Sequence, residues 1–156
     1  MNDIGTKFER MVAADLGGRV RPGSGCLPFA KADVITPAVL VECKASNSGI
    51  VRVKAEWIKT IRTHAGNEKL AWALAACPTM RYTDDYWIFT EIPLVCDPLN
   101  GCFTYQHTGK SFPTSKGTMP DTDEVFVLSF SGLKVAVVHK TLFIAKHHEI
   151  ITGVFR

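Results

Sequence analysis

Residues 38–45, AVLVECKA, form the stretch that most restricts how this chain can fold. Alternate residues of a β-strand point to the same face, so Glu42 and Lys44 share one face. The opposite face carries small apolar side chains such as Val41 and Cys43, as a buried sheet face requires. The sequence therefore predicts a core strand that directs a carboxylate and an ammonium group together into a different environment.

Length and composition predict one globular domain over residues 1–156. The 46% hydrophobic and 21% charged residues are near the averages of globular proteins, which argues against disorder. No apolar run reaches the roughly 18 residues of a membrane-spanning helix, and the N-terminal residues lack the pattern of a secretory signal. We therefore expect a cytoplasmic protein without a membrane partner. A net charge of +3 permits a polyanionic partner without requiring one.

The five cysteines are an odd number with no C-x-x-C pair, which argues against a disulfide framework and suits a reducing compartment. Cys96, Cys102 and His107 match no familiar zinc-site spacing. We therefore interpret the cysteines as buried or incidental thiols rather than as zinc ligands.

Apolar residues at helical spacing predict a first helix over residues 4–16, and the glycines that follow end it. A second amphipathic helix is expected within residues 51–65, starting near residue 53, and a closing helix over 141–150. A short strand is expected to begin at residue 19 and to run into a loop.

Runs rich in β-branched, aromatic or small apolar residues predict strands. They fall at residues 32–36, 38–45, 69–77, 85–92, 125–130 and 134–140. The alanines within 69–77 leave a helix as the alternative there. The first two are separated by a proline and are expected to form a hairpin. Residues 97–124 are rich in Gly, Pro, Ser and Thr and predict a long loop or irregular insertion. The order of elements predicts an α/β fold, a mixed β-sheet flanked by helices.

If the hairpin forms, Asp33 can converge with Glu42 from the neighbouring strand. Two close carboxylates repel unless a cation lies between them, and Mg²⁺ is commonly held by one or two carboxylates together with a substrate phosphate. Lys44 could then orient the attacking water or stabilise charge on the phosphate. These groups suit metal-dependent hydrolysis of a phosphodiester. The alternative is that Glu42 and Lys44 are an exposed cross-strand pair and Asp33 caps a turn.

A resemblance to a known family rests on four short motifs. The AD of residues 32–33, followed by the VECK of 41–44, resembles the PD-(D/E)xK nuclease motif. The FER of residues 8–10 and the RPGSG of 21–25 resemble, more narrowly, the archaeal type of Holliday junction resolvase and its phage relatives. In that group a helix-borne glutamate, a Gly-Ser-Gly loop, an aspartate and E-x-K occur in this order. The resemblance covers about residues 4–65 and implies a restriction-endonuclease-like fold.

The resemblance also implies roles for individual residues. Asp33 and Glu42 would bind Mg²⁺, for which Mn²⁺ can substitute, and Lys44 would assist the attacking water. Glu9 would complete the acidic cluster as a further metal ligand, and Ser24 would contact phosphate or water. The alternatives are that Glu9 is a solvated helix charge and that Ser24 is a turn residue.

The sequence departs from the family pattern in three places. Ala32 replaces the usual proline, which supplies shape and no chemistry. In the second helix, where the family often has a glutamine facing the site, this chain has AEW at residues 55–57. The resemblance does not extend past about residue 97.

Basic residues flank Asp33, Glu42 and Lys44 on both sides in the sequence. They are Arg10, Arg19, Arg21, Lys31, Arg52, Lys54, Lys59 and Arg62. Together they predict a positive rim that binds phosphates without reading base sequence. As the DNA-binding residues we select Arg10, Arg21, Lys31, Arg52 and Lys54. For any one of them the alternative is an ordinary solvated charge. Lys110 and Lys116 could add contacts to a branched substrate.

The resemblance implies a Mg²⁺-dependent, structure-selective DNA endonuclease that cleaves Holliday junctions. Symmetric cleavage of a four-way junction requires two active sites, so a homodimer is expected. The alternatives are another nuclease of the same superfamily, such as a restriction, repair or exonuclease enzyme, and a DNA-binding protein without catalysis.

Overall fold

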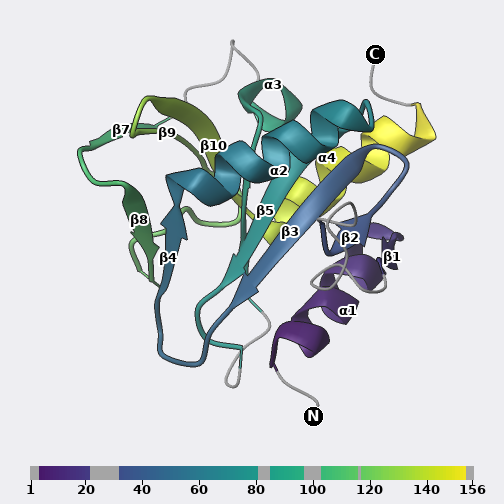
Figure 1. The fold of residues 1–156 in the computed structure, drawn as a ribbon, viewed down its shortest axis with the longest axis horizontal. Helices are drawn as coiled ribbons and strands as arrows, with labels where there is room; N and C mark the ends of the chain where they lie inside the picture. Colours follow the sequence, from purple (N-terminus) through teal and green to yellow (C-terminus); the bar gives the residue numbers. More distant parts are fainter. Residues whose placement is uncertain (1–3, 22–31, 81–84, 97–102, 116, 154–156) are drawn as a thin grey trace.

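The computed structural model describes residues 4–21, 32–80, 85–96, 103–115 and 117–153. Within these ranges, one sheet has eight strands in the order β1-β2-β3-β5-β6-β10-β9-β7, and a second sheet pairs β4 with β8 (Figure 1). The strands are β1 (Arg19–Val20), β2 (Val34–Ile35), β3 (Val39–Ala45), β4 (Val51–Lys54), β5 (Ala71–Cys77), β6 (Trp87–Thr90), β7 (Phe103–His107), β8 (Ser111–Thr114), β9 (Val125–Phe130) and β10 (Leu133–His139). The helices are α1 (Ile4–Leu16), α2 (Ala55–Asn67), α3 (Ile92–Val95) and α4 (Lys140–Thr152).

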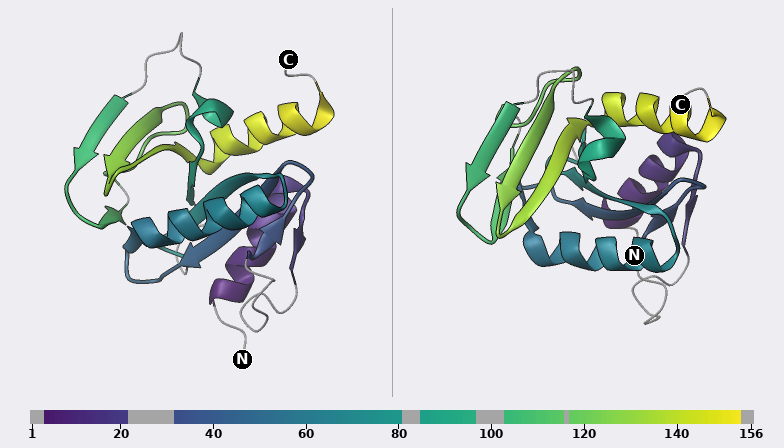
Figure 2. Two further views of the ribbon diagram at one scale, coloured as in Figure 1. Left: turned by 45° about the horizontal axis from the view of Figure 1, so that its top comes forward. Right: turned by 90° about the horizontal axis from the view of Figure 1, so that it is seen from above.

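Helices cover both faces of the main sheet. In the two views of Figure 2, α2 lies on one face and α1 and α4 lie on the other. Leu40 of β3 belongs to the core under α2, together with Ile58 of that helix. Val41 belongs to the core under α1, together with Phe8. The predicted mixed α/β sheet flanked by helices is confirmed.

The predicted hairpin between residues 32–36 and 38–45 is also confirmed. β2 pairs antiparallel with β3, with Val34 opposite Val41. The turn is closed by Thr36, whose hydroxyl oxygen accepts hydrogen bonds from the backbone amides of residues 38 and 39. On its other side β3 pairs in parallel with β5. The strand that carries Glu42 is therefore held from both sides.

The first helix ends as its sequence predicts. Gly17 adopts a positive φ of 66°, a conformation that glycine tolerates best. Gly18 then passes so close to β2 that a Cβ atom there would lie 2.6 Å from the carbonyl oxygen of Ile35. Glycine at position 18 therefore allows the close approach of α1 to the hairpin that bears Asp33.

The prediction of a helix from about residue 53 is wrong at its start, because Val51–Lys54 form strand β4. Val51 and Val53 are buried while Arg52 and Lys54 are exposed, which is the period of a strand. β4 pairs antiparallel with β8, a partner about sixty residues away along the chain. The helix α2 begins only at Ala55.

The prediction that residues 97–124 lack regular structure is wrong as well, since β7 and β8 lie within them. β7 pairs in parallel with β9, and β8 pairs with β4. Both strands depend on partners that local composition does not reveal. The strand predicted over residues 85–92 is shorter than expected, because α3 begins at Ile92.

The cysteines differ in state. Cys43 and Cys77 are free, whereas Cys96 is disulfide-bonded. The expectation of incidental thiols is therefore wrong at Cys96. None of the described helices has the length and apolar character needed to cross a membrane.

His147 of α4 is a core histidine that should make stability sensitive to pH. It is 4% exposed, and its Nε2 lies 2.8 Å from the hydroxyl of Thr36 in the β2–β3 turn. Burial, followed by the charge of His148, lowers the pKa of His147. As the pH falls below about 6.5, His147 is therefore protonated more readily in the unfolded chain than in the folded protein. The free energy of unfolding falls as a result.

We expect the free energy of unfolding to fall less between pH 7.5 and pH 5.5 in His147→Asn than in the wild type. Urea unfolding monitored by circular dichroism at both pH values measures this difference. His148→Asn is the matched control, because the exposed neighbour is the smaller cause and should leave most of the pH dependence in place. Equal pH dependence in wild type and His147→Asn would contradict the prediction.

Candidate active site

Asp33 is fixed by its backbone and by its side chain. Its amide donates to the carbonyl oxygen of Val41 at 3.0 Å, and its own carbonyl oxygen accepts from the amide of Arg21 at 2.9 Å. The carboxylate Oδ2 accepts from the backbone amide of Cys43 at 2.8 Å. Asp33 therefore lies at the end of the β2–β3 ladder, beside the strand positions that carry Glu42 and Lys44.

Glu42 and Lys44 lie side by side on the face of β3 that is covered by α2. The Lys44 Nζ is 3.3 Å from Glu42 Oε2, and the two side chains are 30% and 22% exposed respectively. The same ammonium lies 4.5 Å from the ring centre of Trp57 in α2. The Lys44 ammonium is therefore held between a carboxylate and an aromatic face.

The surroundings of Glu42 disfavour its charged form. Burial, followed by the negative charge of Asp33, raises the pKa of Glu42 to about 7, although Lys44 acts in the opposite direction. At neutral pH this carboxyl group is thus only partly ionised. A further cation next to Asp33 and Glu42 would remove the repulsion and favour ionisation.

Cys43 lies between these groups on the strand, with its side chain on the α1 face. Burial raises the pKa of its thiol well above the usual value, and the charges of Asp33, Glu9 and Glu42 raise it further. The charges of all three predicted acidic residues thus act on this one position, with Glu9 approaching from α1. In the ranges that the structure describes, no group of three or more His, Cys, Asp or Glu residues is placed to hold a metal ion. Asp33 and Glu42 are therefore the candidate pair, and Glu9 as a ligand stays a prediction.

The predicted DNA-binding residues are spread over several elements. Arg10 is exposed on α1, and Arg52 and Lys54 are exposed on β4. Ser24 and Lys31 lie outside the described residues.

Arg21 is engaged elsewhere. Its Nη1 donates to Glu68 Oε2 at 2.6 Å, at the C-terminal end of α2. The structure therefore ties this guanidinium to α2, and a role in binding DNA would require it to leave Glu68.

Trp57 is the residue near this site that sequence reasoning missed. The sequence pattern placed it on the apolar face of a helix, but its ring contacts the ammonium groups of Lys44 at 4.5 Å and Lys54 at 5.5 Å. The available signal was the spacing of Lys54 and Trp57, which brings a cation and an aromatic ring together across the first turn of a helix.

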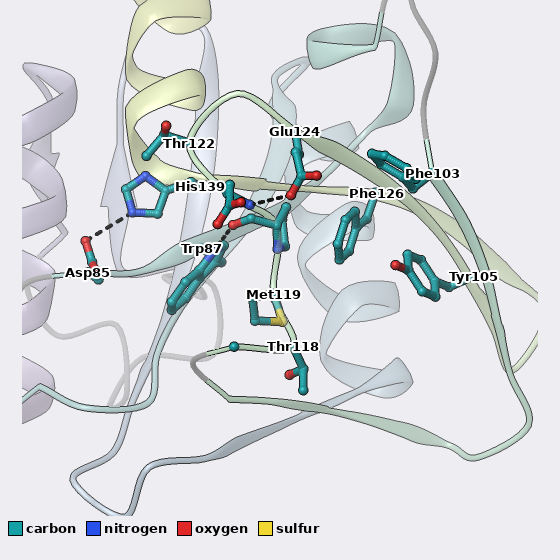
Figure 3. A pocket seen from close by; sticks show the side chains of 13 residues that line it. Asp85, Trp87, Phe103, Tyr105, Thr118, Met119, Thr122, Glu124, Phe126 and His139 are labelled. Carbon is teal, nitrogen blue, oxygen red and sulfur yellow. Dashed lines mark hydrogen bonds and ion pairs between the residues drawn. The ribbon is translucent and has the colours of Figure 1, made fainter.

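A cavity of about 620 Å³ elsewhere in the molecule is not this site (Figure 3). None of the predicted site residues lines it. His139 at its wall accepts a hydrogen bond from the amide of Thr141 through Nδ1, and its Nε2 lies 3.1 Å from Asp85 Oδ1. His139 therefore caps the start of α4, and both of its ring nitrogens are occupied.

No family model and no curated protein matches this sequence. Among solved structures, the chain is similar to Hjc, a Holliday junction resolvase from the archaeal hyperthermophile Archaeoglobus fulgidus. The two are 17% identical, the match covers 71% of this chain and 86% of that chain, and the TM-score is 0.47.

Proposed function

We propose that this protein is a Mg²⁺-dependent endonuclease that hydrolyses phosphodiester bonds in branched DNA, with the four-way Holliday junction as its substrate. The observation that carries the proposal is the convergence of Asp33 and Glu42 across a hairpin, beside the ammonium of Lys44. A sheet that only needed a core would not place two repelling carboxylates there. The order of the four sequence motifs supports the same reading.

The two carboxylates fit Mg²⁺, and Asp33 and Glu42 would hold it. Oxygen donors are the ligands that this ion prefers, and the raised pKa of Glu42 marks a place where a cation is favoured. Bound Mg²⁺ would neutralise charge on the phosphate and activate the attacking water. Mn²⁺ would be accepted by the same donors, and Glu9 would contribute from the α1 side.

Lys44 would stabilise the transition state. Its ammonium, positioned by Glu42 and Trp57, can interact with the negative charge that develops on the phosphate oxygens. The oxygen of water forms a new bond to phosphorus, the bond from phosphorus to the 3′-oxygen breaks, and the leaving oxygen takes up a proton. The products are a 3′-hydroxyl and a 5′-phosphate.

Resolution of a four-way junction requires paired cuts in two strands, so the proposal includes a homodimer with two equivalent sites. Size-exclusion chromatography with light scattering at micromolar concentration should give twice the mass of the 17.2 kDa chain. A monomer under these conditions would argue for a nuclease that makes single cuts.

The test of the activity uses the wild type and Asp33→Asn with an end-labelled four-way junction and a linear duplex of the same sequence. Each is incubated with Mg²⁺ or with EDTA. We expect the wild type to make paired nicks in the junction when Mg²⁺ is present. We expect no nicks in the linear duplex, in EDTA or with Asp33→Asn. Asp33→Asn keeps the shape of the side chain and removes its negative charge, so the metal should bind weakly.

Other outcomes would replace the proposal. Equal cutting of junction and linear duplex would indicate a general nuclease of the same superfamily. Binding of the junction without cutting, in both proteins and with either Mg²⁺ or Mn²⁺, would indicate a DNA-binding protein whose carboxylates are structural.

A further inference from the structure

A basic cavity of about 490 Å³ lies at the start of α2. It is lined by Lys54, Ala55, Glu56, Lys59, Lys110, Ser111 and Ser131. These residues come from the end of β4, the first turns of α2, the turn between β7 and β8, and the turn between β9 and β10. Three stretches that are far apart in the sequence, residues 54–59, 110–111 and 131, thus meet around one opening.

The backbone around this cavity is held in place by hydrogen bonds. The carbonyl oxygen of Lys110 accepts from the amide of Ala55 at 2.9 Å, which ties the β7–β8 turn to the start of α2. Ser111 is the partner of Lys54 in the β4–β8 ladder. The relative positions of Lys54 and Lys110 are therefore fixed by the fold.

The charge of the lining selects an anion. Lys54, Lys59 and Lys110 are exposed ammonium groups, and Glu56 is the one carboxylate among the residues that line the cavity. Among the described residues, none of these three lysines forms a salt bridge. The hydroxyl groups of Ser111 and Ser131 add hydrogen-bond donors. Ammonium and hydroxyl donors without a protein counter-ion are suited to phosphate.

The cavity is joined to the candidate active site through one side chain. Trp57 contacts Lys54, which lines the cavity, and Lys44, which belongs to the site. A polyanion bound at Asp33, Glu42 and Lys44 could therefore continue along α2 into the cavity.

We infer that the cavity is a second phosphate-binding subsite. It holds a backbone phosphate of the same DNA strand that is cut at the candidate active site of Asp33, Glu42 and Lys44. Lys59 and Lys110 are its principal cations, and Lys54 lies between it and the scissile phosphate. The subsite reads no base sequence, because it contacts backbone only. This inference rests on the proposed function, since DNA supplies the phosphate.

The test is the salt dependence of DNA binding by Lys59→Gln/Lys110→Gln, measured in EDTA so that no strand is cut. The matched control is Lys69→Gln/Lys134→Gln, which removes the same charge from exposed positions away from the cavity. Each phosphate contact contributes about 0.9 to the slope of log K against log salt concentration. We expect the cavity variant to lower the slope by about 1 to 2 and the affinity about tenfold, with the control close to wild type.

If the wild type binds DNA and the cavity variant shows the same slope as the wild type, the subsite is overturned and the nuclease proposal stands. A wild type that binds no branched, duplex or single-stranded DNA would overturn the proposed function. Equal loss of slope in both double variants would also overturn the subsite, because it would indicate a response to net charge alone.

Discussion

Replacing Lys44 with alanine is expected to lower the single-turnover rate of junction cutting by about 10²- to 10³-fold, the cost of losing one preorganised donor to transition-state charge. The affinity for the junction should change little, since one ammonium among many basic residues contributes a small part of phosphate binding. The side chain is 30% exposed, so the substitution leaves no large cavity in the core. Single-turnover cutting with excess protein and a gel-shift Kd in EDTA separate the two effects.

Lys54→Ala is the matched control for Lys44→Ala. Both lysines contact the ring of Trp57, but only Lys44 reaches Glu42. Lys54→Ala should weaken binding only slightly and leave the cutting rate at saturation nearly unchanged. The catalytic role of Lys44 would be refuted by wild-type cutting in Lys44→Ala, or by equal loss of rate in both variants.

The central part of the fold could be predicted from local sequence because its signals are local. The alternation in residues 38–45 identifies both faces of β3, and the proline that separates it from residues 32–36 indicates the hairpin. The first helix carries its own termination signal in two glycines. By contrast, β4, β7 and β8 are defined by pairing with distant strands, and the sequence of β8 contains the turn-forming residue Pro113. In β8, tertiary pairing outweighs local propensity.

The contacts of the candidate site likewise include some that the sequence predicts and some that it does not. Asp33, Glu42 and Lys44 come together because hairpin register follows from sequence. The pair of Arg21 with Glu68 could not be foreseen, because it joins the end of β1 to the C-terminus of α2 across the fold. The contact of Trp57 with Lys44 was also hidden, since it depends on how α2 crosses β3. Sequence periodicity gives the face on which a residue lies, but not what packs against that face.

Replacing Glu42 with glutamine is expected to abolish cutting and to make the protein more stable. Burial and Asp33 raise the pKa of Glu42 from 4.5 to about 7, so the ionised form destabilises the metal-free fold despite Lys44. The folded state holds this proton more tightly than the unfolded chain does, so stability falls as the pH rises from about 4.5 to about 7. Glutamine cannot ionise and avoids that loss. At pH 8 in EDTA the gain should be on the order of 3 kcal/mol, because the pKa is raised from 4.5 to about 7 and each pKa unit corresponds to roughly 1.4 kcal/mol.

Urea unfolding of wild type and Glu42→Gln at pH 8 and at pH 4.5 measures this gain, which should nearly vanish at the lower pH because both side chains are then uncharged. Glu56→Gln is the control, since that carboxylate is exposed on α2 and should give no comparable gain.

Adding Mg²⁺ at pH 8 should stabilise the wild type and leave Glu42→Gln nearly unchanged, because only a folded protein with its ligand intact gains binding energy. Stabilisation of both proteins to the same extent by Mg²⁺ would place the metal elsewhere, and a lack of any gain at pH 8 in EDTA would show that Lys44 fully compensates the buried charge. A protein that becomes more stable as it loses activity would identify Glu42 as a residue retained for chemistry at a cost to the fold.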